Sequence, residues 1–132
     1  MLALQKTADM QGLELREVPS PRTPGEGEVL IKVAATGICG SDLAIDNWTK
    51  SYSAFMTNLP VTLGHETAGT IVAAGPGVAP EWAGRRVVVN PSVSCGRCAP
   101  CLKDDLVGCV DRQSIGMVQN GAFAQYFLAP AD

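Results

Sequence analysis

The chain has 132 residues, of which 46% are hydrophobic and 17% charged, and its formal net charge at pH 7 is −3. This length is enough for one domain with its own apolar core, and the composition is typical of a globular protein. Because the charge is not basic, we expect no nucleic-acid partner. Because no apolar run approaches roughly 18 residues, we expect no membrane span.

Residues 1–9 lack a basic start and a sustained apolar stretch, so they do not resemble a secretory signal. The expected compartment is therefore the cytoplasm, where thiols stay reduced and structural disulfides are rare.

In chain order, a first strand is expected over residues 13–18 and the clearest strand over residues 29–35, after a turn rich in Pro and Gly. Val29, Ile31 and Val33 share one face of this second strand because successive side chains of a strand point to opposite sides.

A short helix is expected to begin at Ser41, a residue type that caps helices well, with Asp42 in its first turn. Another helical turn is expected after Pro100. Three more strands are predicted, over residues 69–74, 86–90 and 122–128.

Short strands joined by Gly- and Pro-containing turns predict a mainly β fold (β-rich α+β), in the form of a closed or partly open β-barrel with short helices. The nearest match to a dinucleotide-binding fingerprint is Gly75-Pro76-Gly77. Pro76 removes a backbone donor there and no helix follows, so this segment is interpreted as a turn. A Rossmann domain is therefore not expected within this chain.

Four of the five cysteines lie within 15 residues, at Cys95, Cys98, Cys101 and Cys109. Four thiolates converging on one point make a closed tetrahedral zinc site, which is structural because no position is left for a substrate. Two disulfides, an iron–sulfur cluster and chance clustering are the alternatives. The spacing to Cys109 differs from that of bacterial ferredoxins, and zinc is favoured.

Cys39 follows the clearest strand, and the single histidine, His65, stands beside Glu66 before another strand. Taken alone, such a cysteine is most often a small buried side chain, such a histidine structural and such a glutamate a surface acid. Together they offer one sulfur, one nitrogen and one oxygen, which is the composition of a catalytic zinc site with an open position. Zinc there would lower the pKa of bound water or alcohol toward ~7.

Asp42 is predicted to accept the remaining ring N–H of His65, and Ser41 to hydrogen-bond a substrate hydroxyl and relay its proton. The alternative is that Ser41 only caps a helix and that Asp42 is a solvated charge in its first turn.

At this point the sequence resembles the zinc-dependent medium-chain dehydrogenases, the alcohol dehydrogenase family. The matching segments run through nearly the whole chain and are residues 24–33, 37–42 (Gly-Ile-Cys-Gly-Ser-Asp), 64–66 (Gly-His-Glu), 68–72, 75–78, the four-cysteine segment and residues 121–126 (Gly-Ala-Phe-Ala-Gln-Tyr).

The resemblance implies a GroES-like partly open β-barrel with two zinc sites and NAD or NADP as the coenzyme of the full-length enzyme. It implies a catalytic zinc at Cys39, His65 and Glu66, with Ser41 in the proton relay and Asp42 supporting His65. It also implies a structural zinc held by Cys95, Cys98, Cys101 and Cys109.

Residues 39–42 and the pair Asn47-Trp48 look closer to the polyol and threonine dehydrogenase branch. Two features depart from the family. Arg85 stands where the family usually has Asp in Gly-Asp-Arg-Val, and the chain ends at Asp132, where the family's nucleotide-binding domain is expected to start.

The sequence therefore predicts one GroES-like catalytic domain over residues 1–132, with a structural zinc lobe at about 92–112. The expected parent is an NAD(P)-dependent dehydrogenase, a homo-oligomer that oxidises a secondary alcohol or polyol to a ketone, and this portion alone is expected to be inactive. The alternative is a GroES-like binding or chaperonin-type module that has the barrel without the chemistry.

Overall fold

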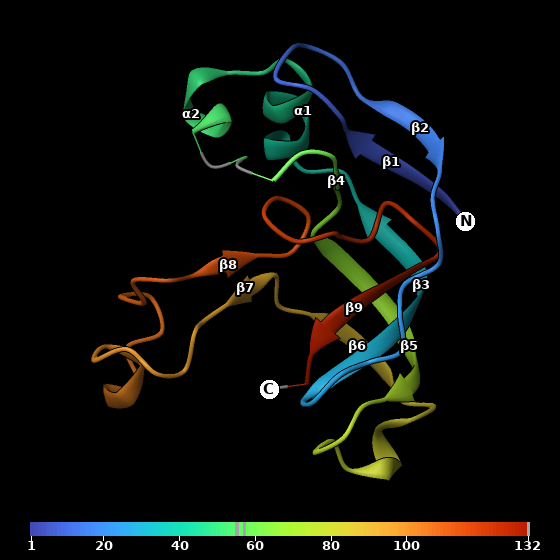
Figure 1. The fold of residues 1–132 in the computed structure, drawn as a ribbon, viewed down its shortest axis with the longest axis vertical. Helices are drawn as coiled ribbons and strands as arrows, with labels where there is room; N and C mark the ends of the chain where they lie inside the picture. Colours follow the sequence, from blue (N-terminus) through green and yellow to red (C-terminus); the bar gives the residue numbers. More distant parts are fainter. Residues whose placement is uncertain (55, 57, 132) are drawn as a thin grey trace.

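A computed structural model describes residues 1–54, 56 and 58–131; Asp132, the last residue of the predicted domain, lies outside it together with residues 55 and 57. Strands make up most of the regular structure of the described residues, and the helices are few and short (Figure 1). The strands are β1 (Leu2–Lys6), β2 (Glu14–Glu17), β3 (Glu28–Gly37), β4 (Val61–Thr62), β5 (Glu66–Ala74), β6 (Arg86–Val89), β7 (Ser92–Val93), β8 (Gln113–Ser114) and β9 (Tyr126–Pro130). The helices are α1 (Gly40–Asp46) and α2 (Lys50–Ser53), with 3₁₀ turns η1 (Pro80–Trp82) and η2 (Cys101–Lys103).

The described strands form three antiparallel sheets, with orders β6-β5-β3-β9, β2-β1-β4 and β7-β8. A bridge between Ala3 and Ala124 links the N-terminal strand to the segment before β9. The predicted mainly β, GroES-like fold is confirmed, and of the two forms considered the open one is found, because these sheets do not close into a barrel.

The larger sheet carries the main apolar cluster. Val29 and Ile31 of β3 are buried and pack with Ile71 of β5 and Phe127 of β9. The strand predicted around these alternating residues is confirmed. Since β3 and β5 are antiparallel, the end of β3 lies beside the start of β5, where Thr36 pairs with Thr67 and Gly37 with Glu66.

A second cluster packs helix α1 against β4. It contains Ile45, Met56, Val61 and Leu63. This packing fixes the helix that follows β3 over the strand that precedes His65.

A buried lysine lies beside this second cluster. The ammonium of Lys6 donates to the carbonyls of Met10, Gly12 and Asp46, at 3.0 Å for Gly12 and 3.3 Å for Asp46. It also lies 4.8 Å from the centroid of the Trp48 ring. The C-terminal end of α1 is thereby tied to the first strand.

The boundaries of several elements differ from those predicted. Helix α1 begins at Gly40 with Cys39 as its N-cap, so the prediction that it begins at Ser41 is wrong. The reason is that the Asp42 carboxylate accepts the N–H of Cys39 at 2.8 Å, which places the cap two residues earlier. The helical turn predicted after Pro100 is confirmed as η2.

Residues 94–112 form a lobe that leaves the sheets between β7 and β8 and projects away from them (Figure 1). Within the part of the chain that the structure describes, no helix is long and apolar enough to cross a bilayer.

Candidate metal and catalytic sites

The junction of β3 and β5 brings together the three residues predicted to hold a catalytic metal. Cys39 follows the end of β3, and His65 and Glu66 stand at the start of β5. One ligand atom from each of the three, a sulfur, a nitrogen and a carboxylate oxygen, lie within 4.8 Å of one another. Residues far apart in the sequence therefore converge because the two strands are antiparallel.

The two nitrogens of the His65 ring face different partners. Nδ1 lies 3.6 Å from Oδ1 of Asp42, and Nε2 lies 3.2 Å from Oγ of Ser41. The Nδ1 and Oδ1 atoms are buried and have no hydrogen-bond partner among the described residues. The Asp42 carboxylate faces Nδ1 of His65 and favours the tautomer that has its hydrogen on Nδ1. In this tautomer Nε2 is the ring nitrogen that can bind a metal.

The carboxylate of Asp42 faces two of the three candidate metal ligands, Cys39 and His65. Its Oδ2 accepts the N–H of Cys39 at 2.8 Å, while its Oδ1 faces His65. Its side chain is only 2% exposed. A single buried carboxylate thus fixes the backbone of the cysteine and faces the ring of the histidine.

Glu66 lies over Gly37 on the neighbouring strand. A Cβ atom added at Gly37 would be 2.5 Å from Oε2 of Glu66, so a larger residue there would displace the carboxylate. The absence of a side chain at this position makes room for the third donor next to the cysteine. A cavity of about 630 Å³ borders His65 and Glu66 and reaches Val88 and Val89 of β6.

Sequence reasoning missed two threonines at this junction. The hydroxyls of Thr36 and Thr67 are buried without a partner among the described residues. Both residues are ordinary in strands, and only the register that pairs them reveals that they lie beside the site.

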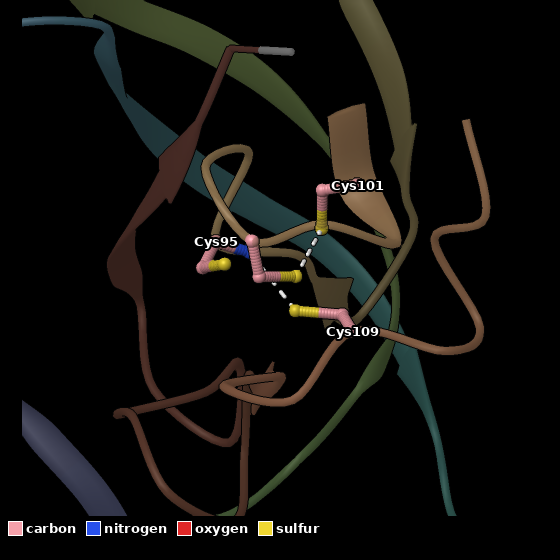
Figure 2. Close-up of side chains that lie close together, drawn as sticks. Cys95, Cys101 and Cys109 are labelled. Carbon is pink, nitrogen blue, oxygen red and sulfur yellow. Dashed lines mark hydrogen bonds between the residues drawn. The ribbon is translucent and has the colours of Figure 1, made fainter. Parts of the chain in front are cut away.

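The four cysteines of the lobe also converge. One sulfur from each lies within 4.8 Å of the others, and all five cysteines of the chain are free thiols. The sulfurs of Cys98 and Cys101 are 3.3 Å apart, and the N–H of Cys95 donates to the sulfur of Cys109 at 3.3 Å. Figure 2 shows the sulfurs of Cys95, Cys101 and Cys109 turned toward one point inside the lobe.

Backbone N–H groups of the lobe are directed at these sulfurs. They lower the pKa of Cys98 to about 6, chiefly through the N–H groups of Cys101 and Val110. The N–H of Cys95 lowers the pKa of Cys109 in the same way, whereas desolvation raises the pKa of Cys101 to about 12. Donors aimed at sulfur stabilise thiolates, and four sulfurs around one point fit a tetrahedral zinc ion.

The two donor sets fit different kinds of metal site. Four thiolates leave no free position, while a sulfur, a nitrogen and an oxygen beside a cavity leave one open. The structure thus brings the seven predicted ligand residues together in two separate groups, and it places Ser41 and Asp42 beside the second.

Comparison with known proteins is consistent with this geometry. Residues 25–132 match the family of the alcohol dehydrogenase GroES-like domain. The chain is 44% identical over 131 residues to L-threonine 3-dehydrogenase of Cutibacterium acnes, and 41% identical over 131 residues to that of Pyrococcus abyssi. Each alignment covers 99% of this chain and 37% of the relative.

Solved structures of dehydrogenases also resemble this chain. Galactitol-1-phosphate dehydrogenase from Escherichia coli superposes with a TM-score of 0.85 at 31% identity, covering 98% of this chain and 36% of that one. The cobalt- and zinc-bound thermostable alcohol dehydrogenase from Pyrobaculum aerophilum superposes with a TM-score of 0.83 at 34% identity, covering 99% and 39%.

The chain thus spans 37% of the length of these two curated relatives. The family resemblance inferred from residues 24–33, 37–42, 64–66, 68–72, 75–78, the four-cysteine segment and 121–126 is confirmed over almost all of the sequence. The chain belongs to the alcohol dehydrogenase GroES-like domain family.

Proposed function

We propose that residues 1–132 form the zinc-binding catalytic domain of an NAD(P)-dependent alcohol or polyol dehydrogenase, with a structural zinc lobe at about 92–112. The observation that carries this proposal is the convergence of Cys39, His65 and Glu66, with their donor atoms within 4.8 Å of one another beside a cavity. The four-cysteine group is the second zinc site of the proposal, and its role is to order the lobe.

Cys39, His65 and Glu66 would hold a zinc ion, which would act as a Lewis acid and lower the pKa of a bound alcohol. Ser41 and Asp42 have the other two roles in this proposal. Ser41 stands 3.2 Å from Nε2 of His65, and its proposed role is to hydrogen-bond the substrate hydroxyl and relay the proton of that hydroxyl to solvent water. Asp42 keeps the proton of His65 on Nδ1, so that Nε2 stays free to bind the metal.

The proposed substrate is a small, polar secondary alcohol that is oxidised to a ketone. L-threonine, named by the relatives that are 44% and 41% identical, carries a secondary hydroxyl, and so does galactitol 1-phosphate, named by a structural neighbour. NAD or NADP would be the coenzyme that accepts the hydride from the alcohol carbon. The active protein is proposed to be a cytoplasmic homo-oligomer that contacts neither nucleic acid nor membrane.

Metal analysis of the purified chain tests the two sites. We expect two zinc ions per chain, and one after Cys39→Ser, since this change removes a ligand of the proposed catalytic site only. A zinc content that Cys39→Ser leaves unchanged contradicts the catalytic site and favours the GroES-like binding module. A brown protein that absorbs visible light indicates an iron–sulfur cluster instead.

Enzyme assays test whether the 132-residue chain is active by itself. We expect no NAD- or NADP-dependent alcohol oxidation by the 132-residue chain alone, because it contains no glycine fingerprint that would hold the nicotinamide within ~3–3.5 Å of the substrate carbon. Measurable turnover by this chain contradicts the expectation.

A further inference from the structure

The segment that leads into His65 is held by a loop that returns from the cysteine lobe. Three consecutive N–H groups, of residues 121–123, donate to the three consecutive carbonyls of residues 62–64. The bonds are Gly121 to Thr62 at 2.8 Å, Ala122 to Gly64 at 2.9 Å and Phe123 to Leu63 at 2.8 Å. We call residues 115–123 the clasp.

Glycines allow the clasp to approach this closely. A Cβ atom added at Gly116 would be 2.6 Å from the carbonyl oxygen of Gly64, and one added at Gly121 would collide with the same oxygen. Gly64 itself has φ of +91°, and a Cβ there would be 2.6 Å from the backbone nitrogen of Phe123. Three backbones without side chains therefore pack directly on one another.

The clasp is itself well anchored. Ile115 is buried in the main apolar cluster, and its N–H donates to the carbonyl of Pro91 at 3.0 Å. The N–H of Gly116 donates to the carbonyl of Gln119 at 2.8 Å, which closes the loop on itself. At its other end the side-chain oxygen of Asn120 accepts the N–H of Thr62 at 2.9 Å. A rigid loop of this kind resists displacement.

Contact of the clasp with Gly64 orients the backbone of His65, because the peptide group that joins the two residues is planar. The carbonyl oxygen of Gly64 and the N–H of His65 belong to the same planar group, so fixing the first orients the second. The His65 ring has polar contacts only with Ser41 and Asp42 among the described residues, at 3.2 and 3.6 Å. The clasp therefore supplies the rigid support on the backbone side of the ring.

We propose that Gly116 and Gly121 are positioning residues, and that their close packing on Gly64 sets the orientation in which His65 binds metal. This inference rests on the proposed function, since it presumes that Cys39, His65 and Glu66 hold a metal ion. It adds that a loop without any ligand atom determines how tightly they hold it.

A cobalt titration of the 132-residue chain tests the proposal. Visible absorption distinguishes Co²⁺ held by four thiolates from Co²⁺ held by one sulfur, one nitrogen and one oxygen, and Cys39→Ser assigns the second signal. We expect Gly116→Ala to weaken Co²⁺ binding at the His65 site by about 10–100-fold, the range typical of groups that orient ligands, without changing the four-thiolate signal.

Gly84→Ala is the matched control. Gly84 has φ of +86° and Gly116 has φ of +78°, so alanine meets the same backbone penalty at both positions. No atom lies within 4 Å of a Cβ added at Gly84, so only Gly116→Ala presses on Gly64. Equal Co²⁺ affinities of the two variants at the His65 site overturn the proposal.

Two asparagine variants test the proposal if Gly116→Ala does not fold. Asn120→Ala removes the acceptor of the Thr62 N–H, and Asn90→Ala removes a comparable acceptor, that of the Ser92 N–H at 3.0 Å, outside the clasp. We expect Asn120→Ala to weaken Co²⁺ binding at the His65 site several-fold, Asn120→Asp to restore it, and Asn90→Ala to leave it unchanged. Equal affinities of Asn120→Ala and Asn90→Ala overturn the proposal.

The same titration distinguishes a failure of the proposed function from a failure of the proposed role of the clasp. If the wild-type chain shows no signal that Cys39→Ser removes, the proposed function fails. If that signal is present and the clasp variants bind Co²⁺ like their controls, the proposed function stands and only the role of the clasp fails.

Discussion

Lys6 is the residue whose burial is least expected from its chemistry. Its side chain is fully buried, and its ammonium donates to three carbonyls from two different segments, at Met10, Gly12 and Asp46. The face of Trp48 adds a cation–π contact at 4.8 Å. The ammonium is therefore bound on several sides, and of its three acceptors only the Asp46 carbonyl has a second donor among the described residues, the N–H of Gly12 at 2.8 Å.

We expect Lys6→Met to lower the free energy of unfolding by about 1–3 kcal/mol, because methionine fills the space but leaves the carbonyls of Met10 and Gly12 without the ammonium that donates to them. Urea denaturation followed by circular dichroism measures the change. Lys50→Met is the control, since Lys50 is exposed and its replacement is expected to change stability by less than about 0.5 kcal/mol. Equal midpoints for the two variants contradict the expectation.

Ser41 makes one side-chain hydrogen bond in the described structure, to Nε2 of His65. We expect Ser41→Ala to leave the melting temperature of the chain nearly unchanged and to lower the turnover of the proposed full-length dehydrogenase by about 10²–10⁴-fold, the usual contribution of a proton-transfer group. Ser53→Ala, on helix α2, serves as the control in both measurements. Full turnover by Ser41→Ala refutes the assignment of the relay.

Candidate ligand residues could be predicted from sequence because cysteine and histidine are few and their spacing is restrictive. Asp42 was also expected beside His65, but the other supporting contacts could not be predicted. Nothing in the sequence marks Lys6 as buried, and the cap at Cys39 depends on where the Asp42 carboxylate turns. The burial of Lys6 depends on tertiary contacts, whereas the contact between Cys39 and Asp42 is a local capping box in which cysteine takes the place usual for Ser or Thr.

Among the elements, helix α1 is capped by one of its own side chains, that of Asp42. Asp42 accepts the N–H of its N-cap, Cys39, which without it would be an unsatisfied donor at the start of a short helix. The same side chain faces His65, so the stability of the helix and the geometry of the site are linked.

We expect Asp42→Ala to lower the free energy of unfolding by about 1–2 kcal/mol and Asp42→Asn to lower it much less, because asparagine keeps an oxygen that accepts the cap N–H. Thermal unfolding of both variants measures this difference. If both variants lose the same stability, the effect comes from charge and not from capping.

Strand prediction succeeded where the apolar pattern was long and failed where pairing partners were distant. The pattern of β3 was sufficient, whereas β4 has only two residues and is defined by its pairing with β1. The strand predicted over residues 122–128 begins only at Tyr126, since residues 121–123 donate their N–H groups to residues 62–64 instead.

At the scale of the molecule, the sheets and the lobe are stabilised by different means. The sheets enclose two apolar clusters. In contrast, the hydrogen bonds that the described structure gives to residues 94–112 join them to one another or to Gln113. Of the lobe's apolar side chains, Leu102, Leu106, Val107 and Val110 are exposed. The lobe therefore depends on its cysteines more than on burial.

We expect metal removal to unfold the lobe and to leave the sheets folded, because the free energy of metal binding is the main source of order in such a segment. Limited proteolysis with mass spectrometry should find cleavage between residues 94 and 112 only in the presence of a chelator. Cys109→Ser should show the same cleavage without chelator. Cleavage first within β3 or β5 would mean that the lobe stabilises the whole domain.

The pairing of β7 with β8 has a consequence for the engineering of this fold. Val93 lies opposite Gln113 and Ser92 opposite Ser114 in antiparallel register, so the nineteen intervening residues, 94–112, occupy the place of an ordinary hairpin turn. A two-residue Asn-Gly linker can close strands related in this way. The lobe is thus an excisable insertion, and a shortened chain that joins Val93 to Gln113 by such a linker should retain the donor atoms of Cys39, His65 and Glu66 on an intact scaffold.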